Sequence, residues 1–396
     1  MPGPLHGVRV LDLSAMISGP LATMLLADQG ADVIKVEAPG IGDVMRYLGT
    51  QRNGVTALFA LSNRNKRGLA VDLKSDDGRR IVLDLAARSD VVVQNFRPGA
   101  VDRLGVGYDD VRAVNPEVIY VSIAGFGSSG PYSSKPVYDN VIQAYSGVAA
   151  VQAGPDGEPT LLRNLVCDKV TAYQAAQAVS AALFARANGR GGQHIELSML
   201  DAAIAFLWTD AAMDIAALAP DAQRSPTIGS VYRATETADG WITGGAVTDA
   251  QFRGACLALG RPELADDPRF ATLADRSAHF RELGAELQTS YQRITKRDFV
   301  ARCEEHGVPV APILELAEVP DDPQVRHNET FSVVDHPQLG ALRTARHAPR
   351  FSGTPTVLPV SARQSPALGE HTDTILRELG HDDVEIASLR ARGAVG

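Results

Sequence analysis

Cysteine is scarce in this chain: Cys167, Cys256 and Cys303 are the only three in 396 residues. Three widely spaced cysteines predict neither a disulfide framework nor a zinc site, because both need paired or clustered thiols. The nine histidines include no H-x-x-x-H pair, so no metal site is expected. Cys167 precedes Asp168 and is a candidate nucleophile, but a small buried side chain is the favoured interpretation.

Long apolar runs and basic segments are also missing. No stretch reaches the roughly 18 uninterrupted apolar residues of a membrane span, and the N-terminal segment does not have the pattern of a secretory signal. The formal net charge is −9, which argues against a nucleic-acid-binding face, and the absence of G-x-S-x-G argues against a serine hydrolase. We therefore expect a cytoplasmic protein without nucleic-acid or membrane partners.

What the sequence contains is an alternation of strand and helix patterns over roughly the first half of the chain. Such an alternation is typical of an α/β fold with a parallel sheet and right-handed crossovers. The expected strands are 8–13, 31–36, 69–73, 90–93, 118–123 and 194–197, and the expected helices are 20–28, 76–87, 169–188 and 200–217.

The composition changes after this part, which predicts more than one domain. We expect a large parallel-sheet domain over 1–218 and a smaller α+β domain over 226–310. Asp239-Gly240, between two strand-like runs, predicts a hairpin turn in the smaller domain. Residues 311–396 are expected to form a linker and a C-terminal return to the large domain, with a helix at 369–380.

Asp168 stands between an apolar run, 161–167, and a long helical pattern. A carboxylate at a helix N-terminus is favoured in its ionised form by the helix dipole, and a poorly solvated carboxylate can attack an activated acyl carbon. From the local sequence alone, the favoured interpretation is a simple helix cap, since Asp is a preferred N-cap residue. Both interpretations stay open at this point.

Two further patterns concern ligands. Gly125–Gly130 fits G-x-G-x-x-G after a strand, but the next helical pattern begins only near Val137, so a flexible loop is favoured over a dinucleotide fingerprint. Basic side chains follow several predicted strand ends, where ligands bind in open α/β sheets. This grouping favours an anionic, nucleotide-like ligand over solvated surface charges; its members are Arg46, Lys66, Arg67, Arg97 and Arg103.

Several long motifs in one order resemble the family III CoA-transferases, the relatives of formyl-CoA transferase, L-carnitine CoA-transferase and bile-acid-inducible protein F. The resemblance runs nearly end to end and is weakest over 220–360. It implies a large Rossmann-like domain built from both chain ends, a small central domain and an interlocked homodimer. The motifs are SGPLATMLLADQGADVIKVEAPGIGD, NRNKRGLAVDLKSDDG, VVVQNFRPGAVDRLGVGYDDV, GFGSSGPYSSKPVYDNVIQAYSG and GEHTDTILRELG.

The resemblance also implies the chemistry. Asp168, in RNLVCDKVTAYQA, matches the catalytic aspartate of the family. Its carboxylate would attack an acyl-CoA thioester to give an aspartyl mixed anhydride, and the retained CoA thiolate would then form an enzyme-bound thioester that the acceptor acid takes up. Coenzyme A or acyl-CoA is then a cosubstrate, no tightly bound cofactor or metal is expected, and the partners are an acyl-CoA and a carboxylic acid.

The site residues follow by motif, with two departures. Ala38 stands where formyl-CoA transferase has an arginine, so a phosphate contact is lost or is supplied by Lys35 or Arg46. The glycine-rich loop of that enzyme is reduced to Gly244-Gly245, which weakens the case for formyl or oxalyl substrates. The implied CoA contacts are Ile17, Ser18, Lys66, Asn95, Phe96 and Arg103, and the acyl pocket is assigned Met16, Tyr138, Arg163, Gly244 and Gly245.

Two other functions compete with CoA transfer. An α-methylacyl-CoA racemase shares the fold, but its catalytic histidine is replaced here by Tyr138, and a phenol with a pKa of ~10 is a poor base at neutral pH. A non-catalytic acyl-CoA-binding protein is the other alternative, since fold alone does not establish activity. Arg163 has two interpretations as well: it pairs with the second carboxylate of a dicarboxylic acceptor such as succinate, or it forms a structural salt bridge.

Overall fold

The computed structural model describes residues 3–154, 157–225, 227–357 and 362–396. The chain divides into two compact units, Met1–Thr209 with Arg326–Gly396, and Asp210–Val325. The sequence predicted domain borders at residues 218 and 310. The contacts within the fold instead assign residues 210–218 and 311–325 to the second unit.

A six-stranded sheet forms the centre of the first unit. Every neighbouring pair of strands is parallel, which confirms the expected α/β class. The order across the sheet is β5 (Lys66–Ala70), β2 (Asp32–Glu37), β1 (Arg9–Asp12), β6 (Val91–Gln94), β7 (Ile119–Ala124) and β8 (Gln193–Ser198).

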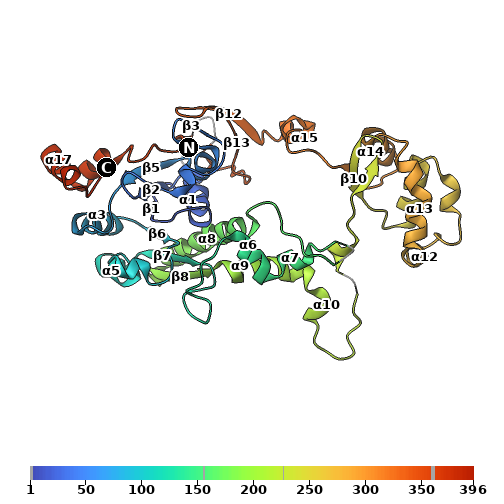
Figure 1. Ribbon diagram of the computed structural model, residues 1–396, viewed down its shortest axis with the longest axis horizontal. Coiled ribbons are helices and arrows are strands. Elements are labelled where there is room, and N and C mark those ends of the chain that lie inside the picture. The colour runs from blue at the N-terminus through green and yellow to red at the C-terminus, as the bar shows by residue number, and fades with distance from the viewer. Residues whose placement is uncertain (1–2, 155–156, 226, 358–361) are drawn as a thin grey trace. The chain divides into compact units, whose positions relative to one another are not determined.

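Helices cover both faces of this sheet, as Figure 1 shows. Successive strand residues point to opposite faces, so Val10 packs in one apolar cluster and Leu11 in the other. The first cluster is covered by α1 (Ser18–Asp28), α6 (Asp139–Ser146), α8 (Val166–Ala185) and α9 (Met199–Ala211). The second is covered by α3 (Asp76–Ala86), α5 (Tyr108–Val114), α16 (Thr372–Leu379) and α17 (Asp383–Ala391).

The end of the chain returns to the sheet beside β5. The backbone N–H of His371 donates to the Gly68 carbonyl at 2.9 Å, and the Thr372 hydroxyl accepts the Ala70 N–H at 3.2 Å. The side chains of Ile375 and Leu376 are fully buried in the second apolar cluster. Helix α16 is therefore an integral part of the first unit.

The second unit contains a three-stranded antiparallel sheet, in the order β11 (Val310–Pro312), β10 (Gly240–Gly244), β9 (Thr235–Thr237). Strands β9 and β10 are the two arms of the hairpin that Asp239-Gly240 predicted. Helices α11 (Asp249–Ala258) and α14 (Lys296–Glu305) bury Phe252 and Phe299 in the two small apolar clusters of this unit.

The remaining elements are short or peripheral: η1 (Val44–Arg46), β3 (Gln51–Arg52), β4 (Val55–Thr56), α2 (Ala57–Asn63), α4 (Ala100–Arg103), α7 (Val148–Val151), η2 (Arg186–Arg190), α10 (Met213–Ala216), η3 (Ile228–Val231), η4 (Pro262–Ala265), α12 (Leu273–Ala278), α13 (Phe280–Tyr291), η5 (Val319–Asp321), α15 (Pro323–His327), β12 (Phe331–His336) and β13 (Gly340–Ala345). Among the described residues, no helix is long and apolar enough to cross a membrane.

Candidate active site

The strand order predicts a ligand-binding crevice beside β1. From β1 the chain first builds β2 and β5 on one side, and then returns to build β6, β7 and β8 on the other. Such a reversal separates the loops that leave two adjacent strands, and ligands of open α/β sheets bind there, beyond the carboxyl ends. In this chain the two loops are the turn that follows β1, residues 13–18, and the segment that follows β6, residues 95–99.

The two loops are joined by the Asn95 side chain. Its amide oxygen accepts the Ala15 N–H at 2.8 Å, and its amide nitrogen donates to the Ala15 carbonyl at 2.7 Å. The same nitrogen lies 3.4 Å from the Ser18 hydroxyl. Glycine at position 19 lets the start of α1 lie close to Ser14, because a Cβ at Gly19 would lie only 2.2 Å from the Ser14 Cβ. The backbone of the turn is therefore held as far as Ser18, the first residue of α1, and forms a wall of the predicted crevice.

Asp168 lies against this wall. It is the third residue of α8, whose N-cap is Leu165 without a side-chain hydrogen bond, so Asp168 does not act as the N-cap of the helix. Its backbone N–H donates to the Asp139 carboxylate at 2.9 Å. The backbone N–H and hydroxyl of Ser18 donate toward its carboxylate. Helices α1 and α8 thus meet with the N-terminus of α1 beside the Asp168 carboxylate, where the helix dipole favours negative charge.

The environment of Asp168 shifts its protonation. Burial and the nearby Asp139 carboxylate raise the pKa of Asp168 to about 7, while the donors of Ser18 act in the opposite direction. A poorly solvated carboxylate with a raised pKa is a stronger base and nucleophile than an exposed one. Perturbed carboxylates in crevices are candidates for catalytic groups.

A buried glutamine ties the segment before α8 to α6. The Gln143 amide nitrogen donates to Asp139 at 2.6 Å and to the Leu162 and Asn164 carbonyls at 3.2 Å each. Its amide oxygen accepts the Leu162 N–H at 2.9 Å. One side chain therefore fixes both the carboxylate that holds the Asp168 N–H and the loop that carries Arg163. The sequence analysis did not predict roles for Asp139 and Gln143. Asp is common in the first turn of a helix, where the helix dipole favours negative charge, so its presence there is no sign of a functional site.

Cys167 is a structural residue. Its side chain is 1 % exposed, and burial, with the charges of Asp139 and Asp168, raises the pKa of its thiol to about 12. The reactive form of cysteine is the thiolate, so the interpretation as a small buried side chain is confirmed.

Three of the basic residues that the sequence grouped around the ligand are buried and paired. The Lys66 ammonium donates to Asp12, the Pro20 carbonyl and Asn63 at 2.8–2.9 Å, which uses all three of its hydrogens. The predicted contact of Lys66 with CoA therefore does not fit this arrangement. Arg46 is held by Glu37 through two hydrogen bonds, and Arg67 pairs with Asp32 and Glu378. Lys35 is fully buried as well. Neither Lys35 nor Arg46 is therefore free to supply the phosphate contact that is lost with alanine at position 38.

Other cationic side chains near the carboxyl ends of the strands are accessible to solvent. Arg97 follows β6, Arg103 ends α4, and both side chains are exposed. Lys74, which the sequence analysis did not single out, is exposed in the turn between β5 and α3. Phe96 is half-buried, with one side packed in the second apolar cluster. The crevice thus offers an aromatic side chain and cations without the buried Lys66.

The predicted acyl-pocket residues of the first unit, Met16, Tyr138 and Arg163, come from three different segments, and the predicted CoA contact Ile17 is next to Met16. Met16 is half-buried in the turn after β1, and its φ of 65° is an unusual backbone conformation for a residue with a side chain. Ile17 is buried with Met45 and Phe59 in a small apolar cluster. Tyr138, at the N-cap of α6, is 69 % exposed. Arg163 is exposed on the loop that Gln143 holds.

Gly244 and Gly245 lie in the second unit, and their place in the acyl pocket stays a prediction. Gly244 ends β10 and pairs with Val310 of β11. A Cβ at Gly244 would lie 2.5 Å from the Pro309 carbonyl oxygen, whereas a Cβ at Gly245 would have no neighbour within 4 Å. Close strand pairing alone is therefore a sufficient reason for glycine at 244, but not at 245.

The G-x-G-x-x-G segment is a loop. No helix begins at Gly130, and α6 starts only at Asp139, which confirms the loop interpretation. Three aromatic rings meet beside it in edge-to-face contacts, those of Phe126, Tyr132 and Tyr145. The Lys135 ammonium lies 3.5 Å from the centre of the Tyr132 ring.

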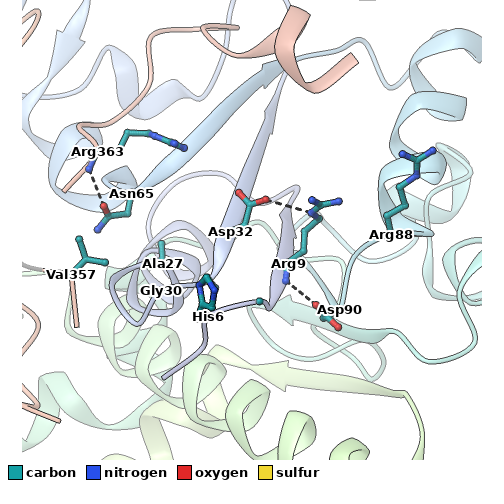
Figure 2. A pocket seen from close by; sticks show the side chains of 12 residues that line it. His6, Arg9, Ala27, Gly30, Asp32, Asn65, Arg88, Asp90, Val357 and Arg363 are labelled. Carbon is teal, nitrogen blue, oxygen red and sulfur yellow. Dashed lines mark hydrogen bonds and ion pairs between the residues drawn. The ribbon is translucent and has the colours of Figure 1, made fainter. Parts of the chain in front are cut away.

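A cavity of about 560 Å³ opens at the opposite end of the strands (Figure 2). It lies at the amino ends of the strands, where Arg9 begins β1 and Asp32 begins β2. The Arg9 N–H donates to Asp90 at 2.8 Å, and the Arg9 side chain pairs with Asp32 at 3.4 Å. The two carboxylates that line this cavity, Asp32 and Asp90, are already paired, and Asp168 lies at the other end of the strands. We therefore do not assign the reaction to this cavity.

Comparisons with known proteins agree with this geometry. The sequence model of CoA-transferase family III matches residues 5–372, and the chain belongs to this family. It is 36% identical to succinyl-CoA:glutarate CoA-transferase from Homo sapiens, over 99% of this chain and 90% of that protein. It is 33% identical to succinyl-CoA–D-citramalate CoA-transferase from Chloroflexus aurantiacus, over 100% of this chain and 98% of that protein.

A solved structure shares the whole architecture. The crystal structure of a CAIB/BAIF family protein from Brucella suis superposes with a TM-score of 0.86 at 33% sequence identity, and covers 96% of this chain and 100% of that one. The sequence resemblance and the α/β fold that it implied are therefore confirmed, and the protein is a family III CoA-transferase.

Proposed function

We propose that the protein moves CoA between two carboxylic acids with Asp168 as the nucleophile. The observation that carries this proposal is the half-buried Asp168 carboxylate, with its raised pKa, at the N-terminus of α1 beside the crevice. Burial leaves the ionised oxygen poorly solvated and reactive, and the donors of Ser18 favour the ionised form by lowering the pKa.

The reaction runs through two covalent states, and no proton has to be gained or lost. The Asp168 oxygen attacks the donor thioester carbonyl, the C–S bond breaks, and a mixed anhydride and CoA thiolate form. The thiolate attacks the aspartyl carbonyl and releases the donor carboxylate, which leaves CoA as a thioester on Asp168. The acceptor carboxylate then repeats both steps in reverse, so that it leaves as its CoA ester and Asp168 is free again.

Retention of CoA makes this sequence efficient. A thiolate that stays bound next to the anhydride attacks as an intramolecular nucleophile, with a large gain in effective concentration. We assign Ile17, Ser18 and Phe96 to the wall along which CoA lies, Asn95 to fixing that wall, and Arg103, Arg97 and Lys74 to its phosphates. Charge-assisted hydrogen bonds from such cations suit phosphate oxygens. The Ser18 N–H also suits the oxyanion that forms when the aspartyl carbonyl is attacked.

We propose that the acids exchanged include dicarboxylic acids. Glutarate and D-citramalate, which appear in the names of the two relatives, each carry two carboxylates. Arg163 lies five residues before Asp168, is exposed, and has its backbone fixed by Gln143. Its guanidinium suits the second carboxylate in a bidentate pair, with Met16 and Tyr138 beside the carbon chain.

We also propose a homodimer. Helices α8 and α9 of the first unit expose large apolar side chains, and exposed apolar surface often marks an interface with another protein. These side chains are Tyr173, Phe184, Phe206 and Trp208, with exposed fractions of 51–73 %. A second copy is the partner that would cover them.

Incubation of the protein with succinyl-CoA and glutarate tests the transfer. We expect equal amounts of glutaryl-CoA and succinate by mass spectrometry, with no net loss of thioester. A screen of other CoA esters and acids then gives the substrate range. Hydrolysis to free CoA without transfer would contradict the proposal, and so would uptake of deuterium from solvent at the α-carbon of a methyl-branched acyl-CoA without exchange of its CoA, which is the signature of a racemase.

A further inference from the structure

Charged side chains lie buried beneath the turn that leads from β1 to Ser18. Asp12, Lys35 and Asp43 are each at most 4 % exposed. The Lys35 ammonium donates to the Ser14 carbonyl at 2.9 Å, and Asp12 accepts the Ser14 N–H at 3.0 Å. Asp43 accepts the Met16 N–H at 3.2 Å. These three residues therefore hold the backbone of the turn from below, while Asn95 holds its middle residue.

Lys35 and Asp43 are also partners of each other. Their charged atoms, Nζ and Oδ2, are 3.1 Å apart, and the side chains are 0 % and 1 % exposed. Asp43 Oδ2 has no hydrogen bond of good geometry, so the firm hydrogen bonds of Asp43 go to backbone N–H groups. Flanking pairs, Asp12 with Lys66 and Glu37 with Arg46, complete a set of three cations and three anions.

Stability alone is a weak reason to bury such a set. Removing two charges from water carries a large desolvation cost, and a well-packed apolar pair in the same place is often as stable or more stable. What the pair fixes here is a turn with Met16 at a φ of 65°. Unusual backbone conformations persist where the surroundings hold them, and they concentrate at functional sites.

We propose that Lys35 and Asp43 are positioning residues, which hold the turn so that the N–H and hydroxyl of Ser18 face the Asp168 carboxylate. This inference rests on the proposed role of Asp168 as the nucleophile. Neither residue touches the substrate, because both side chains are buried under the turn. They act through Ser14 and Met16 on the first residue of α1.

The pH dependence of the reaction reports this role. The groups that face Asp168 are Ser18 from α1 and Asp139 from α6, with the neutral Cys167 thiol and the exposed Lys169 next to it in α8. The donors of Ser18 lower the pKa of Asp168, and Asp139 raises it. If the turn relaxes, the ionised form of Asp168 loses its donors, and the acid limb of kcat/KM moves to higher pH.

Three double variants separate positioning from stability. K35M/D43L replaces the ion pair by apolar side chains, and K35M/D43N keeps an amide oxygen that can accept the Met16 N–H. The control R64M/D28L removes another buried pair, in which Arg64 and Asp28 lie 2.6 Å apart. The hydrogen bonds described for these two side chains go to each other, to Thr344 and to Asn65, all outside residues 13–18. Each double variant leaves the net charge unchanged, so a moved acid limb cannot come from a changed overall field.

In K35M/D43L we expect kcat to fall roughly ten- to hundredfold, the effect of a displacement of about 1 Å at a reacting group. The acid limb should move to higher pH, and K35M/D43N should fall between this variant and the wild type. R64M/D28L should keep kcat and the acid limb, whatever its Tm. The inference is overturned if folded K35M/D43L, or K35M/D43N where K35M/D43L does not fold, keeps the wild-type kcat and acid limb. An equal loss in R64M/D28L overturns it too.

The failure of this inference is distinguishable from the failure of the proposed function. Hydroxylamine trapping of the wild-type protein with an acyl-CoA shows directly that Asp168 is acylated. A trapped Asp168 together with unaltered double variants contradicts the positioning role alone. An unlabelled Asp168 in an active wild-type protein contradicts the nucleophile itself, and the positioning role with it.

Discussion

At the scale of single residues, Asp168 combines two properties that oppose each other. The burial that makes its carboxylate reactive in the proposed mechanism also makes the ionised form costly in the folded protein. Its pKa is raised to about 7, so the folded state binds a proton more tightly than the unfolded state does. Between the unfolded and the folded pKa, stability therefore decreases as the pH rises.

Replacement of this carboxylate should stabilise the protein while it removes activity. We expect D168N to lose CoA transfer by roughly three orders of magnitude or more. At pH 8 its free energy of unfolding should exceed that of the wild type by about 1–3 kcal/mol, and the difference should shrink as the pH falls toward 4. Urea unfolding at several pH values measures this. The matched control D201N, at an exposed carboxylate in the first turn of α9, should show no such pH-dependent gain.

Arg163 should decide between classes of acceptor acid. In R163Q the KM for glutarate should rise roughly ten- to hundredfold, the range for loss of a charge-assisted hydrogen bond. The KM for a monocarboxylic acid of similar length should stay within a factor of two or so of the wild type, since a monocarboxylic acid has no second charge to bind. R190Q, at an exposed arginine in η2, is the control. An equal rise for both acids would show that Arg163 only shapes the loop.

At the scale of secondary-structure elements, burial raises the pKa of Asp168, and the contact between α6 and α8 raises it further through Asp139. In D139N an amide oxygen can still accept the Asp168 N–H, but the negative charge that raises the pKa of Asp168 is gone. The acid limb of kcat/KM should therefore move to lower pH. An unmoved limb in a folded variant would show that burial alone raises this pKa.

The start of α1 requires glycine at position 19. A Cβ at Gly19 would overlap Ser14, 2.2 Å from its Cβ, so G19A should displace the turn and lower kcat about tenfold or more. G284A in α13 is the matched control, because a Cβ there has no neighbour within 4 Å. Steady-state kinetics with folded variants checks this, and a wild-type kcat in G19A would mean that the turn adapts without loss.

The elements of the sheet show what the sequence could reveal. Strands β1, β2, β6 and β7 were predictable because their β-branched runs are buried on both faces. The start of β5 was not, because Lys66 and Arg67 look like surface residues. Arg67 is paired with Glu378, more than 300 positions away, and such a partner leaves no local signal. For the same reason the exposed Lys74, and not Lys66, is the accessible cation of this segment.

At the scale of the whole molecule, the long motifs predicted the family, which the comparisons confirm. They also pointed to Asp168, whose role stays a proposal, but they did not predict the contacts around it. Asp139 and Gln143 act through hydrogen bonds between α6 and the loop before α8, which depend on how the helices pack. The turn after β1 is held from β2, η1 and the segment after β6. Residues of these segments meet only in the folded sheet, so spacing along the chain does not predict them.

The proposed homodimer gives a prediction at the same scale. F206E/W208E places two charges among the exposed apolar side chains of α8 and α9. Charges in an apolar interface are poorly solvated and oppose association. Sedimentation velocity should show a dimer for the wild type and a monomer for this variant. D201N is again the control and should remain dimeric, and a wild-type protein that is monomeric at micromolar concentration would contradict the proposal.

Acylation of Asp168 is the step on which the proposed reaction depends most. Wild-type protein is incubated with succinyl-CoA, treated with hydroxylamine and digested, and the peptide that carries residue 168 is examined by tandem mass spectrometry. We expect an aspartyl hydroxamate at Asp168, dependent on succinyl-CoA and absent from D168N. A protein that transfers CoA while Asp168 remains unlabelled, or carries the label at another residue, would contradict the central claim.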